Sequence, residues 1–226
     1  LQGTNAHLVD INDHFNIDLK KLPDNANMTL VPHVFGAAAE LPQRTKVIED
    51  IAQAIGGDAG RNSDVAVTSF YATKLMTTGE GGMLLTDDQA IANYARDRRE
   101  YDNRDTYLQR FAYKMTDIQA AIGRIQLRRL PTFIARRREI AERYTAAFQA
   151  LPFKGLPRHA RHVFFRYVVA TEQRAELQAY LNSHGIEAKK PVYKPANHYF
   201  EFNSPNQSIT LEKHYPNADR AHDEAL

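Results

Sequence analysis

The sequence contains no cysteine among its 226 residues. Disulfide frameworks and thiolate metal sites are therefore excluded, although this absence does not fix a cellular compartment. The formal net charge is only +2, so no strong overall field indicates nucleic acid or a membrane surface as a partner. No apolar run approaches the roughly 20 residues of a membrane-spanning helix, and no signal peptide is recognisable. We therefore expect a soluble, cytoplasmic protein.

Two further features bear on what the chain binds. Its nine histidines show no ligand spacing such as His-x-x-x-His, so no metal site is expected. A run of arginines could form a nucleic-acid patch, but Glu139 and Glu142 interleave with it, which favours a solvated helix face. The arginines of this run are Arg124, Arg128, Arg129, Arg136, Arg137, Arg138 and Arg143. We therefore expect no nucleic-acid partner.

Short apolar segments separated by helical or loop connections predict an α/β fold with a mostly parallel sheet. The segments predicted as strands are residues 7–11, 28–31, 46–50, 64–70 and 82–86. After the last of these the apolar period becomes helical, which predicts helices over residues 89–99 and 116–129. Pro131 fits the first turn of another helix, which continues to about residue 151.

Prolines and glycine then interrupt the pattern around residues 152–157. We place a domain boundary there, between a large domain of residues 1–151 and a smaller α/β lobe of residues 152–226. Within the lobe, residues 163–170 are predicted as a strand and residues 172–184 as a helix. The chain begins without an initiator Met and ends in a helix-like run. We therefore expect both domains to be partial, as an internal portion of a longer polypeptide.

Lys74 stands between the end of the strand predicted at residues 64–70 and the glycine-rich stretch of residues 79–82. Backbone geometry, rather than solvent, fixes a side chain in such a position. A lysine amine held there can lose its proton more easily than a free one and form a Schiff base with a carbonyl. The ordinary alternative, a surface lysine after an edge strand, is the commoner case for an arbitrary lysine.

Three polar residues close to predicted strand ends have both an ordinary and a functional interpretation. Asp50, followed three residues later by Gln53, resembles the capping box that begins a helix. The same carboxylate could instead hold a protonated ring nitrogen. Ser69 could bind a phosphate oxygen, although a strand serine with a backbone partner is more common. In parallel sheets, ligands bind beyond the carboxyl ends of the strands, and Asp50, Ser69 and Lys74 are all predicted to lie at or just after a strand end.

Four blocks taken together resemble the DegT/StrS-type sugar aminotransferases, which are fold-type-I enzymes dependent on pyridoxal 5'-phosphate (PLP). These blocks are Val47–Ala54, Ser69–Lys74, Thr77–Gly82 and Met115–Gly123. The resemblance implies that Lys74 forms the Schiff base with the cofactor and later shuttles a proton. It implies that Asp50 pairs with the pyridinium nitrogen, that Gln53 sits by the ring and that Ser69 holds the phosphate. The cofactor would supply the chemistry, and the protein its orientation and charge.

The resemblance further implies transfer of an amino group, typically from glutamate, to a nucleotide-linked keto-sugar. Such reactions serve the biosynthesis of cell-surface polysaccharides or secondary metabolites. Family members are homodimers with shared active sites. A related branch carries histidine in place of the lysine and dehydrates sugars, and Lys74 argues against that branch. A PLP-dependent dehydratase or eliminase on the same scaffold nevertheless stays an alternative.

Residues 110–115 depart from the family pattern, because Ala112 replaces an asparagine that reaches the partner subunit's cofactor phosphate. The substitution removes a hydrogen-bond donor. A second alternative is therefore a degenerate, non-catalytic homologue that acts as a binding or regulatory protein.

Overall fold

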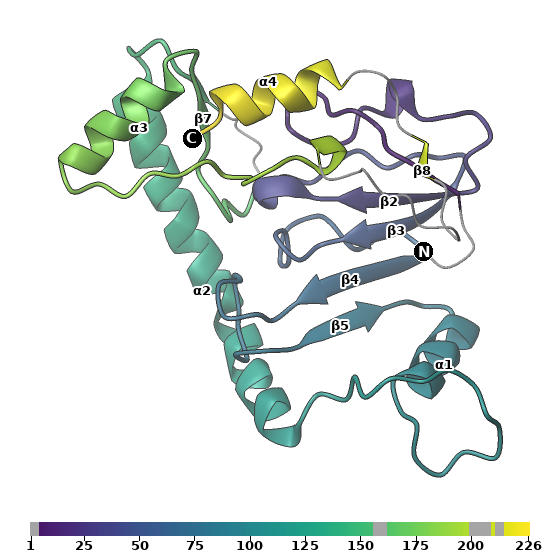
Figure 1. Ribbon diagram of the computed structural model, residues 1–226. Helices are drawn as coiled ribbons and strands as arrows, with labels where there is room; N and C mark the ends of the chain where they lie inside the picture. The colour runs from purple at the N-terminus through teal and green to yellow at the C-terminus, as the bar shows by residue number, and fades with distance from the viewer. Residues whose placement is uncertain (1–4, 156–161, 199–208, 211–214) are drawn as a thin grey trace. The chain divides into compact units, whose positions relative to one another are not determined.

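The computed structural model describes residues 5–155, 162–198, 209–210 and 215–226 (Figure 1). The described chain forms two compact units. The first, here called the sheet unit, comprises residues 26–140 together with residues 162–165. The second, here called the terminal unit, comprises the other described residues. The domain boundary expected at residues 151 and 152 stays a prediction.

The sheet unit contains a four-stranded sheet in the order β2-β3-β4-β5. Its strands are β2 (Met28–Pro32), β3 (Lys46–Asp50), β4 (Val65–Ser69) and β5 (Gly82–Leu85). The first three strands are parallel, and β5 is antiparallel to β4 (Figure 1). Four of the predicted strands are therefore present, and the predicted α/β class with a mostly parallel sheet is confirmed.

The two faces of this sheet differ in burial. Alternate residues of β2 and β3, such as Val31 and Glu49, are buried. The intervening residues point to the opposite face, where Leu30 remains 59% exposed and Asp50 is half-buried. One face is thus part of the core, and the other is open to solvent.

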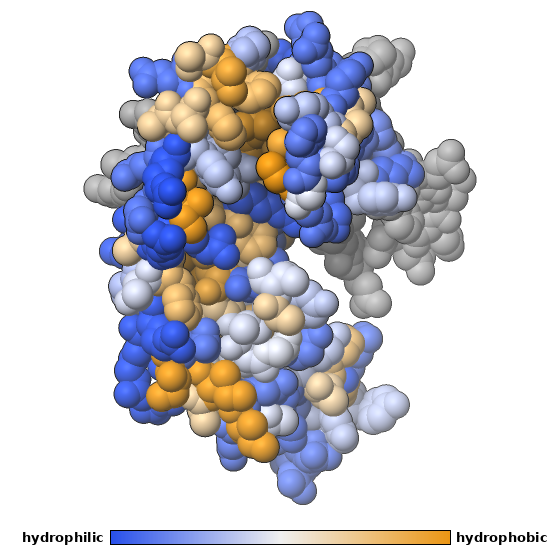
Figure 2. Space-filling view, turned by 90° about the vertical axis from the view of Figure 1, so that its left-hand side faces the viewer, coloured by the Kyte–Doolittle hydropathy of each residue, from blue (hydrophilic) through white to orange (hydrophobic). Residues whose placement is uncertain are grey.

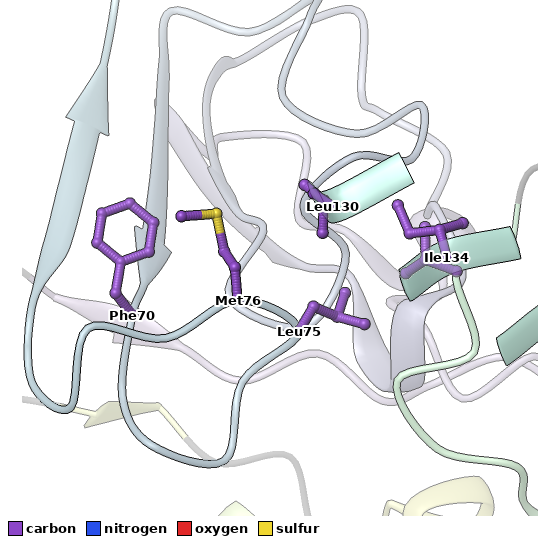
Figure 3. Packing of buried hydrophobic residues seen from close by; sticks show 6 residues of the cluster. Phe70, Leu75, Met76, Leu130 and Ile134 are labelled. Carbon is purple, nitrogen blue, oxygen red and sulfur yellow. The ribbon is translucent and has the colours of Figure 1, made fainter. Parts of the chain in front are cut away.

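The core of the sheet unit joins the loop after β4 to the long helix α2 (Asp117–Phe148). Phe70, Leu75 and Met76 from the loop pack with Leu130 and Ile134 from the helix (Figure 3). The prediction that Pro131 opens a separate helix is wrong, because α2 runs through it. A proline removes one backbone hydrogen bond, but the buried residues on either side of Pro131 hold both turns against the same cluster.

Helix α1 (Gln89–Arg98) confirms the helix predicted at residues 89–99. The carboxylate of Asp88 accepts hydrogen bonds from the backbone N–H groups of Ala90 and Ile91. It thereby satisfies two of the donors that a helix start leaves unpaired. The single-turn helix η2 (Val34–Gly36) follows β2.

The terminal unit contains helices α3 (Arg174–Ser183) and α4 (Pro216–Glu224) and short paired segments. Strand β1 (Ala6–His7) pairs with β8 (Ile209–Thr210), and β6 (Lys154–Gly155) pairs with β7 (Val169–Ala170). Single turns are η1 (Leu19–Lys21) and η3 (Ala196–His198). Helix α3 confirms the helix predicted at residues 172–184, and Gly185 follows it in a left-handed conformation.

Three local predictions in these regions are wrong. The strand predicted at residues 163–170 is present only at Val169–Ala170, since Phe164 has a φ of 48° that no strand accommodates. The strand predicted at residues 7–11 ends at His7, because the Asp10 carboxylate turns to accept the N–H groups of Asn217 and Ala218. The chain also does not end within a helix, since α4 ends at Glu224.

Among the described residues, no helix has both the length and the apolar character needed to cross a bilayer. No cluster of three or more acidic, cysteine or histidine side chains in this part of the chain is arranged to hold a metal ion.

The packing of α2 predicts a contrast between two isoleucines on the same helix. Replacing Ile134, which is 5% exposed, by Ala should lower the free energy of unfolding by about 2–4 kcal/mol, because it leaves a cavity in the cluster. The same change at the exposed Ile140 should cost less than about 1 kcal/mol. Urea denaturation measures both values. Equal losses at the two positions would contradict this description of the core.

Candidate active site

Lys74 lies in a loop that is closed at its base. The backbone N–H of Thr78 and the hydroxyl of Thr77 both donate to the carbonyl of Phe70, at 2.9 and 3.1 Å. Leu75 follows Lys74 directly and is buried in the core cluster. The loop is thus fixed on both sides of Lys74, whose side chain is half-buried. This is the backbone-controlled position that the sequence predicted.

Asp50 and Ser69 end the neighbouring parallel strands β3 and β4. Asp50 is in register with Val67, so Ser69 lies two residues further along the same face. This is the half-exposed face of the sheet, at the edge formed by the carboxyl ends of the strands. The structure therefore brings Asp50 and Ser69 to one edge and one face, as the strand-end positions predicted.

Gln53 is held by the turn that follows β2. Its amide oxygen accepts the backbone N–H of Phe35 at 2.8 Å, so it does not reach back to the N–H of Asp50 as a capping box requires. Asp50 Oδ1 accepts the N–H of Ala52 at 2.9 Å, and turns rather than a helix follow it. The capping-box interpretation is therefore wrong, and both side chains retain hydrogen-bonding capacity.

The turn that holds Gln53 also touches the residue that faces Lys74. A Cβ atom on Gly36 would lie 2.8 Å from the backbone nitrogen of Phe165, so Gly36 and Phe165 are in close contact. The Lys74 ammonium lies over the Phe165 ring, with Nζ 5.5 Å from the ring centre. In the described chain no hydrogen bond or ion pair joins Lys74 directly to Asp50, Gln53 or Ser69. Lys74 is connected to Gln53 only indirectly. Lys74 contacts Phe165, Phe165 contacts Gly36, and the neighbouring Phe35 donates to Gln53.

Each candidate residue keeps a group that can bind a ligand. Lys74 Nζ has no hydrogen bond or ion pair within the described ranges, and Asp50 uses one carboxylate oxygen only. Gln53 uses its oxygen and leaves its amide nitrogen to donate. Ser69 Oγ accepts the N–H of Tyr71, which leaves its hydroxyl proton for another acceptor. The set offers one amine, one carboxylate and two hydrogen-bond donors.

A buried pair of titratable groups lies directly behind Asp50. Nε2 of His33 is 2.8 Å from Oε2 of Glu49, and both side chains are almost fully buried. Nδ1 of His33 accepts the N–H of Ala39, so the neutral ring carries its proton on Nε2, toward Glu49. Glu49 Oε2 also accepts the N–H of Gly60, which ties the far end of the loop after β3 to the strand.

Burial lowers the pKa of His33, and the carboxylates of Glu49 and Asp50 oppose this shift without reversing it. The neutral form is also the one that accepts the Ala39 N–H, because a second ring proton would replace the acceptor with a donor. His33 is thus a neutral ring whose Nε2 lies 2.8 Å from a buried carboxylate oxygen.

The sequence interpretation missed His33, Glu49 and Phe165. Glu49 could have been assigned to the face opposite Asp50, because neighbours along a strand point to opposite faces. Phe165 carried no such signal, since no spacing connects it to Lys74. Ala112 is exposed, as are most of its neighbours in the loop between α1 and α2.

Two arginines of the basic run take part in structure instead of lining a solvated face. Arg137 donates to the carbonyls of Phe164 and Phe165, at 3.0 and 3.1 Å. Arg138 donates to the carbonyl of His162 at 3.0 Å. The segment of residues 162–165 is thereby bound to α2 within the sheet unit.

Polar side chains lie at the carboxyl edge of parallel strands, with a half-buried lysine in the adjoining loop, in an α/β protein. This edge is the usual place for ligands in such sheets. Residues 2–226 match the model of the DegT/DnrJ/EryC1/StrS aminotransferase family. The chain belongs to this family.

Two named relatives are similar to this chain in sequence, and a solved structure shares its fold. GDP-perosamine synthase of Caulobacter vibrioides is 31% identical, over 85% of this chain and 60% of the relative. The dTDP-3-amino-3,4,6-trideoxy-alpha-D-glucose transaminase of Streptomyces venezuelae is 33% identical, over 77% of this chain and 52% of the relative. The E. coli GDP-4-keto-6-deoxy-D-mannose-3-dehydratase, solved with bound hydrated PLP, superimposes with a TM-score of 0.83. The superposition covers 98% of this chain and 68% of that structure at 20% sequence identity, which shows a shared fold.

The chain therefore spans between about half and three fifths of the length of these curated relatives.

The buried histidine predicts a specific dependence of stability on pH. The pKa of His33 in the folded protein lies below its ordinary value of 6.5, so the unfolded chain binds the proton more tightly. His33 thus stabilises the fold above about pH 6.5, and this contribution is lost as the pH falls toward the folded pKa. The expected loss from this residue is at most about 1.4 kcal/mol per pH unit.

Urea denaturation between about pH 8 and pH 5 tests this dependence. His33→Gln should unfold more easily at the upper end of the range but lose less stability on acidification than the unchanged protein. His14→Gln, at an exposed histidine, is the matched control and should keep the original slope. An unchanged slope in His33→Gln would show that His33 does not set the dependence.

Proposed function

We propose that this protein is a PLP-dependent aminotransferase acting on nucleotide-linked keto-sugars, in the biosynthesis of cell-surface polysaccharide or secondary metabolites. The observation that carries the proposal is the amine of Lys74, half-buried and without an ionic partner in the described chain. Asp50, Gln53 and Ser69 lie around the adjoining strand ends. Family membership and the names of two relatives, a GDP-perosamine synthase and a dTDP-sugar transaminase, support the reaction class.

The donor set fits PLP, whose groups are an aldehyde, a basic ring nitrogen and a phosphate. When bound, the cofactor supplies an electron sink that makes proton removal from an adjacent carbon feasible. The free carboxylate oxygen of Asp50 would accept a hydrogen bond from the protonated ring nitrogen and so favour the cationic ring. The Gln53 amide nitrogen would donate to an oxygen on the ring. The Ser69 hydroxyl would donate to the phosphate.

Lys74 has two tasks in this proposal. Its Nζ would hold the cofactor aldehyde when no substrate is present, as a nucleophilic amine. Once released, the same Nζ would be the group that accepts a proton from the amino donor's carbon and returns it. Both tasks need an amine that stays in place without a permanent counter-ion, which agrees with the absence of a carboxylate partner within the described ranges.

We further propose glutamate as the amino donor, a homodimer as the working assembly and the cytoplasm as its location. Exposed apolar side chains on the first part of α2, including Ile118, Ile122 and Ile125, support a protein partner on this face. Figure 2 views the side of the molecule that α2 follows and shows hydrophobic side chains gathered toward its lower end.

Replacing Lys74 by Ala should abolish the visible absorption band that PLP gives when joined to a lysine amine, and should reduce sugar amination to background. The physical reason is that no other described amine lies in the closed loop between Phe70 and Thr78. Absorbance after addition of PLP measures the first effect. Mass analysis of a nucleotide-linked keto-sugar incubated with glutamate measures the second.

Lys114→Ala is the matched control, because Lys114 forms an ion pair with the Glu100 carboxylate, and it should retain both properties. Persistence of the band in Lys74→Ala would refute the role of Lys74. A band with loss of water from the sugar, and no added amine, would favour the dehydratase alternative. Failure of the unchanged protein to bind PLP would favour a non-catalytic homologue.

Replacing Ser69 by Ala should weaken PLP binding about 10- to 100-fold, since one hydrogen bond to a charged phosphate is lost. Ser63→Ala is the control. Ser63 lies before the other end of β4, and its hydroxyl donates to the Val65 carbonyl. Titration of the apoprotein with PLP gives both dissociation constants. Equal affinities for the Ser69 variant and the unchanged protein would remove Ser69 from the phosphate site.

A further inference from the structure

Phe165 is the described residue that contacts the charged end of Lys74. Nζ lies over the ring face, 5.5 Å from its centre, within the range of a cation–π attraction. The ring is half-buried and packs against the core cluster that contains Leu75. Its position is therefore set by the same packing that fixes the Lys74 loop.

The backbone around Phe165 is held by several independent contacts. The Arg137 guanidinium donates to the carbonyls of Phe164 and Phe165, and burial lowers the pKa of this arginine. The N–H of Val163 donates to the carbonyl of Gly36 at 3.0 Å. Val163 itself is fully buried. The segment is thus anchored from α2, from the turn after β2 and from the core.

Local strain accompanies this anchoring. Phe164 adopts a φ of 48°, a left-handed conformation that is costly for an aromatic residue. Any side chain on Gly36 would collide with the Phe165 backbone. A strained backbone conformation persists only where the surrounding contacts fix it. Here the strained residue directly precedes Phe165, whose ring lies against Lys74.

We propose that Phe165 is a positioning residue for Lys74, with Arg137 fixing the backbone that carries the ring. A carboxylate at this place would bind the ammonium strongly and hold its proton. An aromatic face attracts the charged amine more weakly and accepts no proton. The ring therefore directs the ammonium form of Lys74 to one place and offers no group that competes for its proton. The catalytic part of this inference rests on the proposed aminotransferase function.

The first test uses the apoprotein and does not depend on PLP. The protein is treated with acetaldehyde and cyanoborohydride, and labelling of Lys74 is compared with that of Lys114 by peptide mass spectrometry. Phe165→Leu should raise the Lys74-to-Lys114 ratio about two- to fivefold, because the ammonium loses its π partner while the amine form does not. Phe165→Tyr retains a ring face and should keep the original ratio.

A matched control exists on α2, where Arg129 lies over the ring of Phe133. Phe133→Leu also removes a half-buried ring below a cation, and should leave the ratio at Lys74 unchanged. Arg137 Nη1 donates to both carbonyls, and Arg137→Lys replaces it by an ammonium on a shorter side chain that lies elsewhere. This variant should therefore shift the ratio in the same direction as Phe165→Leu, by a smaller factor. The Arg137→Lys variant tests the inference if Phe165→Leu does not fold.

The second test measures kcat and KM for sugar amination. Phe165→Leu should lower kcat about tenfold with little change in KM, since the amine is misplaced while substrate binding is retained. An unchanged labelling ratio in both Phe165→Leu and Arg137→Lys would overturn the inference. If the ratio shifts but the unchanged protein neither binds PLP nor aminates a sugar, the contact stands and the proposed function fails.

Discussion

The packing of Leu75 and Met76 against α2 is the interaction on which the rest of the site depends. These residues follow Lys74 immediately and are buried with Leu130 and Ile134. Because one loop supplies both the apolar anchors and the amine, the core determines where Lys74 lies. The same cluster includes Val163, and Phe165 packs against it. One hydrophobic core therefore places both the amine and its aromatic neighbour, and the backbone hydrogen bonds described above reinforce both positions.

Much of this arrangement follows from local sequence, and the remainder does not. The ends of β3 and β4 are set by apolar runs of the right length, so Asp50 and Ser69 could be assigned to the carboxyl edge of the sheet. Continuity of α2 through Pro131 could not be predicted, because it depends on burial against a loop distant in sequence. The conformation of residues 162–165 depends on Arg137 and Gly36, which no local pattern connects with them.

Gln53 illustrates why a motif alone left its role open. Spacing from Asp50 allowed either a capping box or a site by a ring, since both use the same side-chain groups. The structure excludes the capping box, because the Gln53 oxygen accepts the N–H of Phe35, a residue with a φ of 58°. The amide nitrogen of Gln53 remains able to donate. The outcome is set by a contact between two separate segments, after β2 and after β3.

The adjacent carboxylates of Glu49 and Asp50 on β3 have opposite surroundings, because neighbours along a strand point to opposite faces of the sheet. Glu49 faces the buried side, where His33 Nε2 lies 2.8 Å from its Oε2 and the N–H of Gly60 donates to the same oxygen. Asp50 faces the open side with one oxygen free. Contacts made by Glu49 thus fix β3 from behind, and Asp50 is left to meet a ligand in the role proposed for it.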